Sequence, residues 1–60
     1  MNGRYVVVEL RKVNVNDECY ERTEHVYNTP QDMIYYADYL AAVAQKDLED
    51  GKIVDFQIEY

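Results

Sequence analysis

The chain has 60 residues, one cysteine, one histidine and a formal net charge of −6 at pH 7. This length predicts a single domain, residues 1–60, and the lone Cys19 excludes an intrachain disulfide. An acidic chain is repelled by nucleic acid and by anionic lipid, because both are polyanions, so we expect no direct binding to DNA, RNA or membrane.

The charge is concentrated in the second half of the chain. Residues 1–30 hold five acids and four bases, a net charge of −1, whereas residues 31–60 hold seven acids and two bases, a net charge of −5. Such a surface suits a basic protein partner. The same charge is also what keeps many small intracellular proteins soluble.

Features of the termini and of the cysteine content predict the compartment. The sequence has no run of about 20 apolar residues, which a membrane span needs, and no apolar signal-peptide segment at the N-terminus. An unpaired cysteine is typical of the reducing cytoplasm, where we expect this protein. The core of so short a chain is marginal without a disulfide or metal, so we also expect a homodimer.

Two strands are predicted in the first half of the chain. Residues 4–13, RYVVVELRKV, are rich in β-branched residues and read as a central strand. Residues 14–17, NVND, form a turn. Residues 18–27, ECYERTEHVY, have the length of a strand but carry charges on both faces, which is typical of an edge strand protected against unwanted pairing.

A helix is predicted over residues 30–49. Thr29 and Asp32 form a capping-box arrangement, and Pro30 occupies the first helical position, where its missing N–H costs nothing. Gly51 supplies the left-handed residue that ends the helix. A third strand, residues 52–59, alternates between apolar and polar side chains.

These elements predict an α+β fold of order ββαβ. The helical connection between the second and third strands should be right-handed. The third strand then lies on the far side of the first. The result is a three-stranded antiparallel sheet of order 2-1-3 with the helix packed on one face.

The stretch YYADY, residues 35–39, places three tyrosines in the predicted helix. At 100° per residue, one apolar stripe faces the sheet: Met33, Ile34, Ala37, Leu40, Ala41, Ala44 and Leu48. Tyr36 borders this stripe. Tyr35 and Tyr39, one turn apart, point outward and are predicted to bind a partner, since tyrosine is favoured at interfaces. The alternative is that they lean back over the sheet edge as a rim of the core.

One helix covers only one face of the sheet. We expect the uncovered face to carry an apolar patch of Tyr5, Val7 and Ile53. A soluble monomer seldom leaves such a patch bare, so these three residues are the predicted dimer contact.

Six acids are predicted to contact a partner in two groups. One group lies along the charged strand and the other at the C-terminal end of the helix: Glu18, Glu21 and Glu24, then Asp47, Glu49 and Asp50. Acids at a helix C-terminus oppose the macrodipole, and a broken local rule marks a candidate functional site. The alternative is that Lys46 and Lys52 offset these negative charges and that the acids have no role in binding.

Catalytic and metal-binding patterns are missing from the sequence. There is no serine, and Cys19 and His25 lie about 20 Å apart in a regular strand, too far for a nucleophile and its base. The two glycines, Gly3 and Gly51, do not form a phosphate loop. We expect no enzyme activity, no metal and no cofactor.

The stretch YERTEHVYNTPQDMIYY, residues 20–36, places a charged strand before a capped helix with aromatic residues. In size, acidity and ββαβ order the whole chain resembles small phage proteins that block host DNA-handling enzymes. The phage inhibitors of uracil-DNA glycosylase are nearest in shape, and small anti-CRISPR proteins fit as well. The resemblance implies a dimeric inhibitor with a DNA-mimicking acidic face and an apolar pocket that holds a side chain of the enzyme.

Two functions therefore follow from the sequence. The first is a small acidic inhibitor that mimics DNA and blocks a basic nucleic-acid-binding enzyme. The alternative is a homodimeric interaction, scaffold or regulatory module without DNA mimicry. Salt separates them, because exposed charge pairs are screened and apolar contacts are not.

Overall fold

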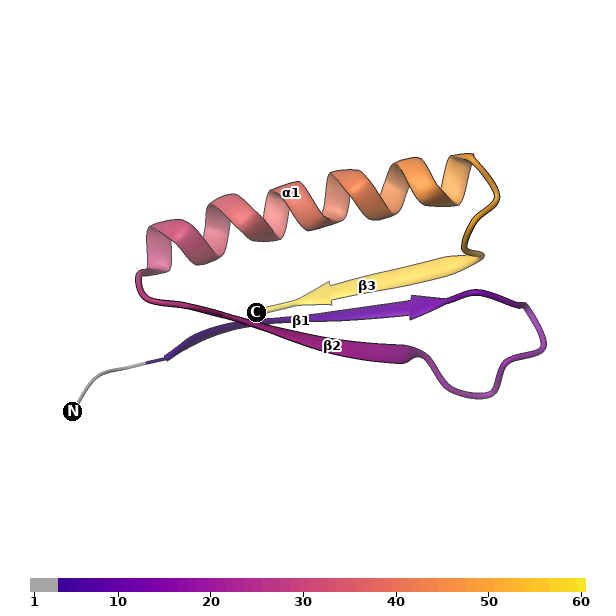
Figure 1. Ribbon diagram of the computed structural model, residues 1–60, viewed down its shortest axis with the longest axis horizontal. Coiled ribbons are helices and arrows are strands. Elements are labelled where there is room, and N and C mark those ends of the chain that lie inside the picture. The colour runs from indigo at the N-terminus through magenta and orange to yellow at the C-terminus, as the bar shows by residue number, and fades with distance from the viewer. Residues whose placement is uncertain (1–3) are drawn as a thin grey trace.

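The computed structural model describes residues 4–60. Three strands and one helix follow one another in the order ββαβ, and their bounds are β1 (Tyr5–Lys12), β2 (Glu21–Tyr27), α1 (Pro30–Glu49) and β3 (Asp55–Glu59). Figure 1 shows α1 lying along one side of the sheet, while the other side has no covering element. This is the predicted α+β fold.

The sheet has the order β2-β1-β3, and both pairings are antiparallel. β1 is central because its side chains are apolar on both faces at its start, whereas β2 is charged and lies at an edge. In the register Val7 lies opposite His25 and Glu9 lies opposite Ile58. Directly opposite residues share a face of the sheet, so the register decides which side chains meet the helix.

Local capping sets both ends of α1. Thr29 has extended backbone, φ −133° and ψ 153°, and its side chain accepts a hydrogen bond of 3.1 Å from the N–H of Asp32. At the other end the N–H of Gly51 donates to Leu48 O at 3.2 Å, and the N–H of Lys52 donates to Asp47 O at 2.8 Å. This pair of bonds is the Schellman motif. Among residues 4–60 no helix combines the length and apolar character of a membrane span.

The core between α1 and the sheet is small. Its buried hydrophobic residues are Val7, Ala37, Ala44 and Ile53. The two alanines let the helix lie close to the sheet, as the apolar stripe predicted. Ile34, at the margin of that stripe, is 51% exposed, so this end of the predicted stripe is not covered by the sheet.

The prediction of which sheet face stays uncovered is wrong. Val7 is 0% exposed and Ile53 is 4% exposed, and Tyr5 is half-buried on the same face as Val7. The helix covers this face, so Tyr5, Val7 and Ile53 are not the apolar dimer contact of a bare sheet. The uncovered face instead carries the opposite row of β1, which is half-buried: Val6, Val8 and Leu10.

The strands are shorter than the sequence predicted. β2 begins at Glu21 rather than at residue 18, and β3 begins at Asp55 rather than at residue 52. The turn at residues 14–17 forms, with the Asp17 N–H donating to Asn14 O at 3.0 Å. Residues 18–20 belong to this connection, since β2 begins at Glu21. The Tyr20 hydroxyl donates to Asp55 at the start of β3.

Candidate partner-binding surface

Four tyrosines lie at the end of β2 and in the N-terminal half of α1, and three of their rings contact one another. We call Tyr27, Tyr35, Tyr36 and Tyr39 the tyrosine surface. The Tyr27 and Tyr36 rings stack with centroids 5.1 Å apart and planes 4° apart, and the Tyr35 ring meets the Tyr36 ring edge-on at 5.0 Å and 87°. Both geometries are favourable for aromatic pairs.

The outer rings of this surface are open to solvent. Tyr35 is 66% exposed, Tyr39 is 58% exposed and Tyr36 is 41% exposed. This confirms that Tyr35 and Tyr39 are exposed. Tyr36, predicted to border the core, is the least exposed of the three and stacks on Tyr27. The contact between Tyr27 and Tyr36 was not predicted, although β2 ends only three residues before the helix begins.

The helix beside the tyrosines carries acids and no bases. Residues 30–45 contain Asp32 and Asp38 but no lysine or arginine, and both aspartates are exposed. Asp32 and Asp38 each lie three residues from Tyr35, and residues at this spacing are neighbours on a helix. The tyrosine surface is therefore flanked by negative charge.

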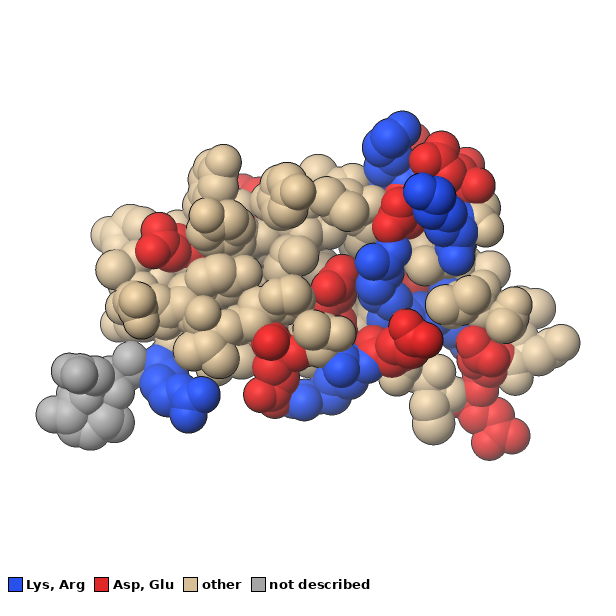
Figure 2. Space-filling view, in the orientation of Figure 1, with Lys and Arg blue, Asp and Glu red and all other residues tan. Residues whose placement is uncertain are grey.

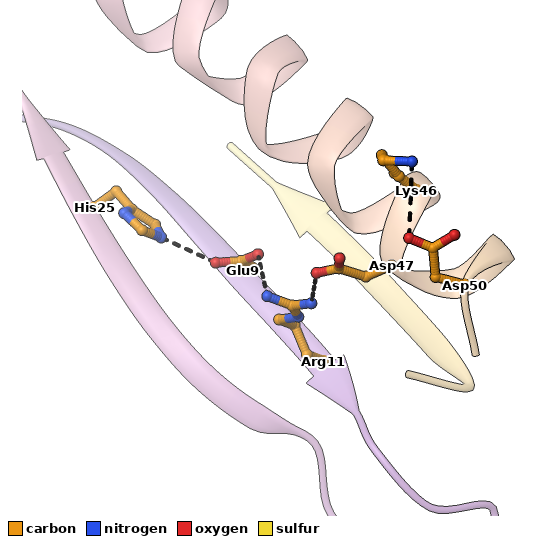
Figure 3. A network of polar contacts seen from close by, with 6 residues as sticks. All are labelled: Glu9, Arg11, His25, Lys46, Asp47 and Asp50. Atoms are coloured by element: carbon orange, nitrogen blue, oxygen red, sulfur yellow. Dashed lines mark hydrogen bonds and ion pairs between the residues drawn. The ribbon is translucent and has the colours of Figure 1, made fainter. Parts of the chain in front are cut away.

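A polar network occupies the space between the other half of α1 and the sheet (Figure 3). Glu9, 7% exposed, has its Oε1 atom 3.2 Å from His25 Nε2 and its Oε2 atom 3.9 Å from Arg11 Nη1. The Arg11 guanidinium also donates to the Asp47 carboxylate. The network joins β1, β2 and α1, and it supplies the buried Glu9 with partners, which a buried charge requires.

This network explains the acids at the C-terminal end of α1. Asp47 is held by Arg11, and Asp50 lies 3.7 Å from Lys46 Nζ. Glu49 accepts a bond of 3.3 Å from Gln45 Nε2. Two of the three acids are thus paired with a base of the same chain. This is close to the predicted alternative, in which bases offset these acids. One of the two bases, Arg11, was not indicated by the sequence.

The acids of the charged strand do not form one array either. Glu24 pairs with Arg22 at 2.7 Å on the uncovered face of the sheet. Glu21 lies opposite Arg11 in the register and so belongs to the helix-covered face. Glu18 is exposed in the connection before β2. Residues three apart on a strand point to opposite faces, and this separates Glu21 from Glu24.

Most of the charged side chains on one face of the molecule lie toward one end (Figure 2). Figure 2 shows lysine, arginine and acidic side chains gathered toward the end that holds the C-terminus of α1, while the opposite half of this face is largely uncharged. At the charged end both signs are mixed. The chain thus offers two distinct surfaces: a mixed-charge end and the tyrosine surface.

Burial and hydrogen bonding raise the pKa of two phenols. The hydrogen bond from Tyr20 to Asp55 is the main cause that raises the pKa of Tyr20 above 10.0, followed by burial and the Asp55 charge. Burial is the main cause that raises the pKa of Tyr27, followed by Tyr36 and Glu9. The Tyr20 phenol therefore keeps the proton that it donates to Asp55 at neutral pH.

No family model matches the chain, and no curated protein or solved structure matches it.

Proposed function

We propose that this chain is a small acidic protein-binding inhibitor that occupies the nucleic-acid-binding surface of a basic enzyme. The observation that carries the proposal is the tyrosine surface. Tyr35 and Tyr39 are exposed, their neighbour Tyr36 is fixed by stacking on Tyr27, and the adjoining charges are acidic.

This arrangement suits arginine and lysine side chains of a partner. A guanidinium stacks on a tyrosine face and is attracted by its quadrupole, and it donates charge-assisted hydrogen bonds to a carboxylate. Stacking on Tyr27 limits the freedom of Tyr36 before binding, which lowers the entropy lost in the complex. The net charge of −6 speeds encounter with a basic surface.

The structure changes the set of residues that we assign to this interaction. Tyr35 and Tyr39 remain the proposed anchors, and Asp32 and Asp38 join them. Asp47 and Asp50 contribute to the overall negative field but are occupied by Arg11 and Lys46. DNA mimicry in this proposal rests on the overall negative electrostatic field and on the tyrosine surface of the helix. It does not rest on a regular row of acids.

A capture experiment tests this proposal. The tagged chain is incubated with bacterial lysate and eluted in a salt gradient, beside the variant Tyr35→Ala/Tyr39→Ala and the control Tyr60→Ala. Tyr60 matches Tyr35 in exposure at 66% but follows β3, at the sheet edge away from β2. We expect the wild type and the control to retain a basic nucleic-acid-binding protein that elutes at moderate salt. The double variant should not retain it.

A homodimeric module without a basic partner is the second candidate. The observation that favours it is the small core, in which Val7 and Ile53 are the only large hydrophobic side chains buried among residues 4–60. Small domains of this kind gain stability from a second copy. Retention of a second copy of this chain without any basic protein would favour this candidate.

A further inference from the structure

The exposed edge of β2 is the starting point for an inference about self-association. β2 lies at the end of the sheet order, and within residues 4–60 its one strand partner is β1. Its seven residues, ERTEHVY, contain no proline. An edge of this kind presents unpaired backbone N–H and C=O groups that a further strand can use.

Symmetry limits how two β2 edges can pair. Two copies of an edge strand pair antiparallel about a twofold axis perpendicular to the sheet, and each face of one sheet then continues into the same face of the other. Opposite residues must share a face, so one residue of the strand lies opposite its own copy, and the axis passes between these two copies. We name each register by this residue. The candidates nearest the middle of Glu21–Tyr27 are Arg22, Thr23, Glu24 and His25.

The charges select one of these four registers. An axis at His25 places two histidines opposite each other and offers no pair of opposite charges. An axis through Arg22 places two arginines opposite each other, and an axis through Glu24 places two glutamates opposite each other. An axis through Thr23 places Arg22 opposite Glu24 of the second copy, and Glu21 opposite His25. Opposite charges in cross-strand pairs stabilise a sheet, and like charges directly opposite destabilise it.

The other edge of the sheet lacks this complementarity. The row of β3 that shares a face with Leu10 carries Asp55, Gln57 and Glu59, with no base. An axis through Gln57 places Asp55 opposite Glu59, and the neighbouring registers offer no opposite charges. Charge complementarity therefore distinguishes the β2 edge from the β3 edge.

We propose that two copies of this chain pair through their β2 edges, antiparallel, with the twofold axis at Thr23. The product is a six-stranded sheet of order β3-β1-β2-β2-β1-β3 with both helices on the same face. The Arg22–Glu24 pair within each chain, 2.7 Å long and about half exposed, then joins the same pair of the second copy in a cluster of four alternating charges at the interface.

The proposed dimer also places the two helices on one face of the joined sheet, with one flank of each toward the twofold axis. Tyr36 stacks on Tyr27 and so belongs to the flank of α1 nearest β2. Val43, 38% exposed, lies on the same flank by helical spacing. Across the β2 pair these flanks face each other, while Tyr35 and Tyr39 stay outside. The dimer therefore displays two outward tyrosine pairs related by the twofold axis.

Disulfide trapping tests the register. In a Cys19→Ser background, Thr23→Cys should form an interchain disulfide on oxidation, because opposite Cα atoms lie about 4.5–5.5 Å apart, within the range of about 4.4–6.8 Å that a disulfide spans. Glu24→Cys is the matched control on the same strand. Its two copies would be about 8 Å apart, two residues out of register. Gln57→Cys is the control on the β3 edge.

We expect covalent dimer from Thr23→Cys, well above either control, on a non-reducing gel after equilibration with glutathione. Equal cross-linking at Thr23, Glu24 and Gln57 would overturn the proposal, as would cross-linking strongest at either control.

A charge swap measured by sedimentation equilibrium provides the second test. Arg22→Glu should weaken dimerisation roughly ten-fold, because it turns two attractive cross-strand pairs into repulsive ones. The variant Arg22→Glu/Glu24→Arg restores both the cross-strand pairs and the pair within the chain, and should recover the wild-type dimer. Circular dichroism checks that each variant is folded.

A wild-type chain that stays monomeric at high concentration would overturn the proposal, and so would a dimer that is indifferent to Arg22→Glu. The inference does not depend on the basic partner. If the chain captures no basic protein but the Thr23→Cys cross-link forms, the proposed function alone is refuted. If a basic protein is captured but the cross-link does not form, the β2 dimer alone is refuted.

Discussion

The ring of Tyr36 on α1 lies parallel to the ring of Tyr27 on β2, with centroids 5.1 Å apart and planes 4° apart. This contact joins the end of the edge strand to the start of the helix and fixes the inner part of the tyrosine surface. A double-mutant cycle with Tyr27→Leu and Tyr36→Leu should show a coupling of about 0.5–1.5 kcal/mol in the free energy of unfolding. Urea unfolding measures it, and strictly additive losses would contradict the role assigned to the stack.

The acids at the C-terminal end of α1 should respond differently to neutralisation. Asp47→Asn removes a charge that is bonded to Arg11 in a part-buried network, so it should destabilise the fold by about 1 kcal/mol. Glu49→Gln removes an exposed charge that opposes the helix dipole, and it should be neutral or stabilising by some tenths of a kcal/mol, roughly. Denaturant midpoints of the two variants compare them directly, and an Asp47→Asn protein as stable as Glu49→Gln would be inconsistent with the network.

The raised pKa values of Tyr20 and Tyr27 predict a loss of stability at alkaline pH. A group whose pKa is higher in the folded state contributes stability below its unfolded pKa, 10.0 for these phenols, and loses it as the pH rises through the folded value. In a titration followed by tyrosinate absorbance, Tyr20 and Tyr27 should ionise above pH 10.0, because the pKa of each is raised from that value. Tyr20→Phe should remove one late-titrating group, and an unchanged alkaline end of the curve would contradict the bond to Asp55.

Gly51 has φ +78°, a left-handed conformation that ends α1. Gly51→Ala should cost about 1 kcal/mol, since a Cβ is disfavoured at this φ. The Cβ would meet no atom within 4 Å, so the cost is that of the backbone alone. Gly51→Asn should cost less, because asparagine tolerates left-handed backbone better. Thermal unfolding of both variants measures the difference, and equal costs would argue against a conformational cause.

The features that depend on neighbours in the sequence could be predicted. The helix begins at Pro30 and ends at Glu49, as its caps indicate, because Thr29, Asp32 and Gly51 act over one turn. The exposure of Tyr35 and Tyr39 followed from helical spacing alone. The strand order also followed, since the most apolar strand is the central one.

The features that depend on distant residues could not be predicted from the sequence. β1 is apolar at its start on both faces, so alternation alone did not decide whether the row of Val7 or the row of Val6 meets the helix. The register resolves this, since Phe56 and Ile58 of β3 lie opposite Arg11 and Glu9 and bring their apolar side chains to that face. For the same reason the pairing of Asp47 with Arg11, 36 residues away, left no local signal.

Displacement of labelled duplex DNA from the captured basic protein tests the proposed function most directly. The wild-type chain and the control Tyr60→Ala should displace the DNA at similar concentrations. Tyr35→Ala/Tyr39→Ala should need at least about ten-fold more protein, since each buried aromatic anchor of an interface contributes more than about 1 kcal/mol. DNA that stays bound in the presence of excess wild-type chain, or equal displacement by all three proteins, would contradict the assignment of the tyrosine surface as the inhibitory site.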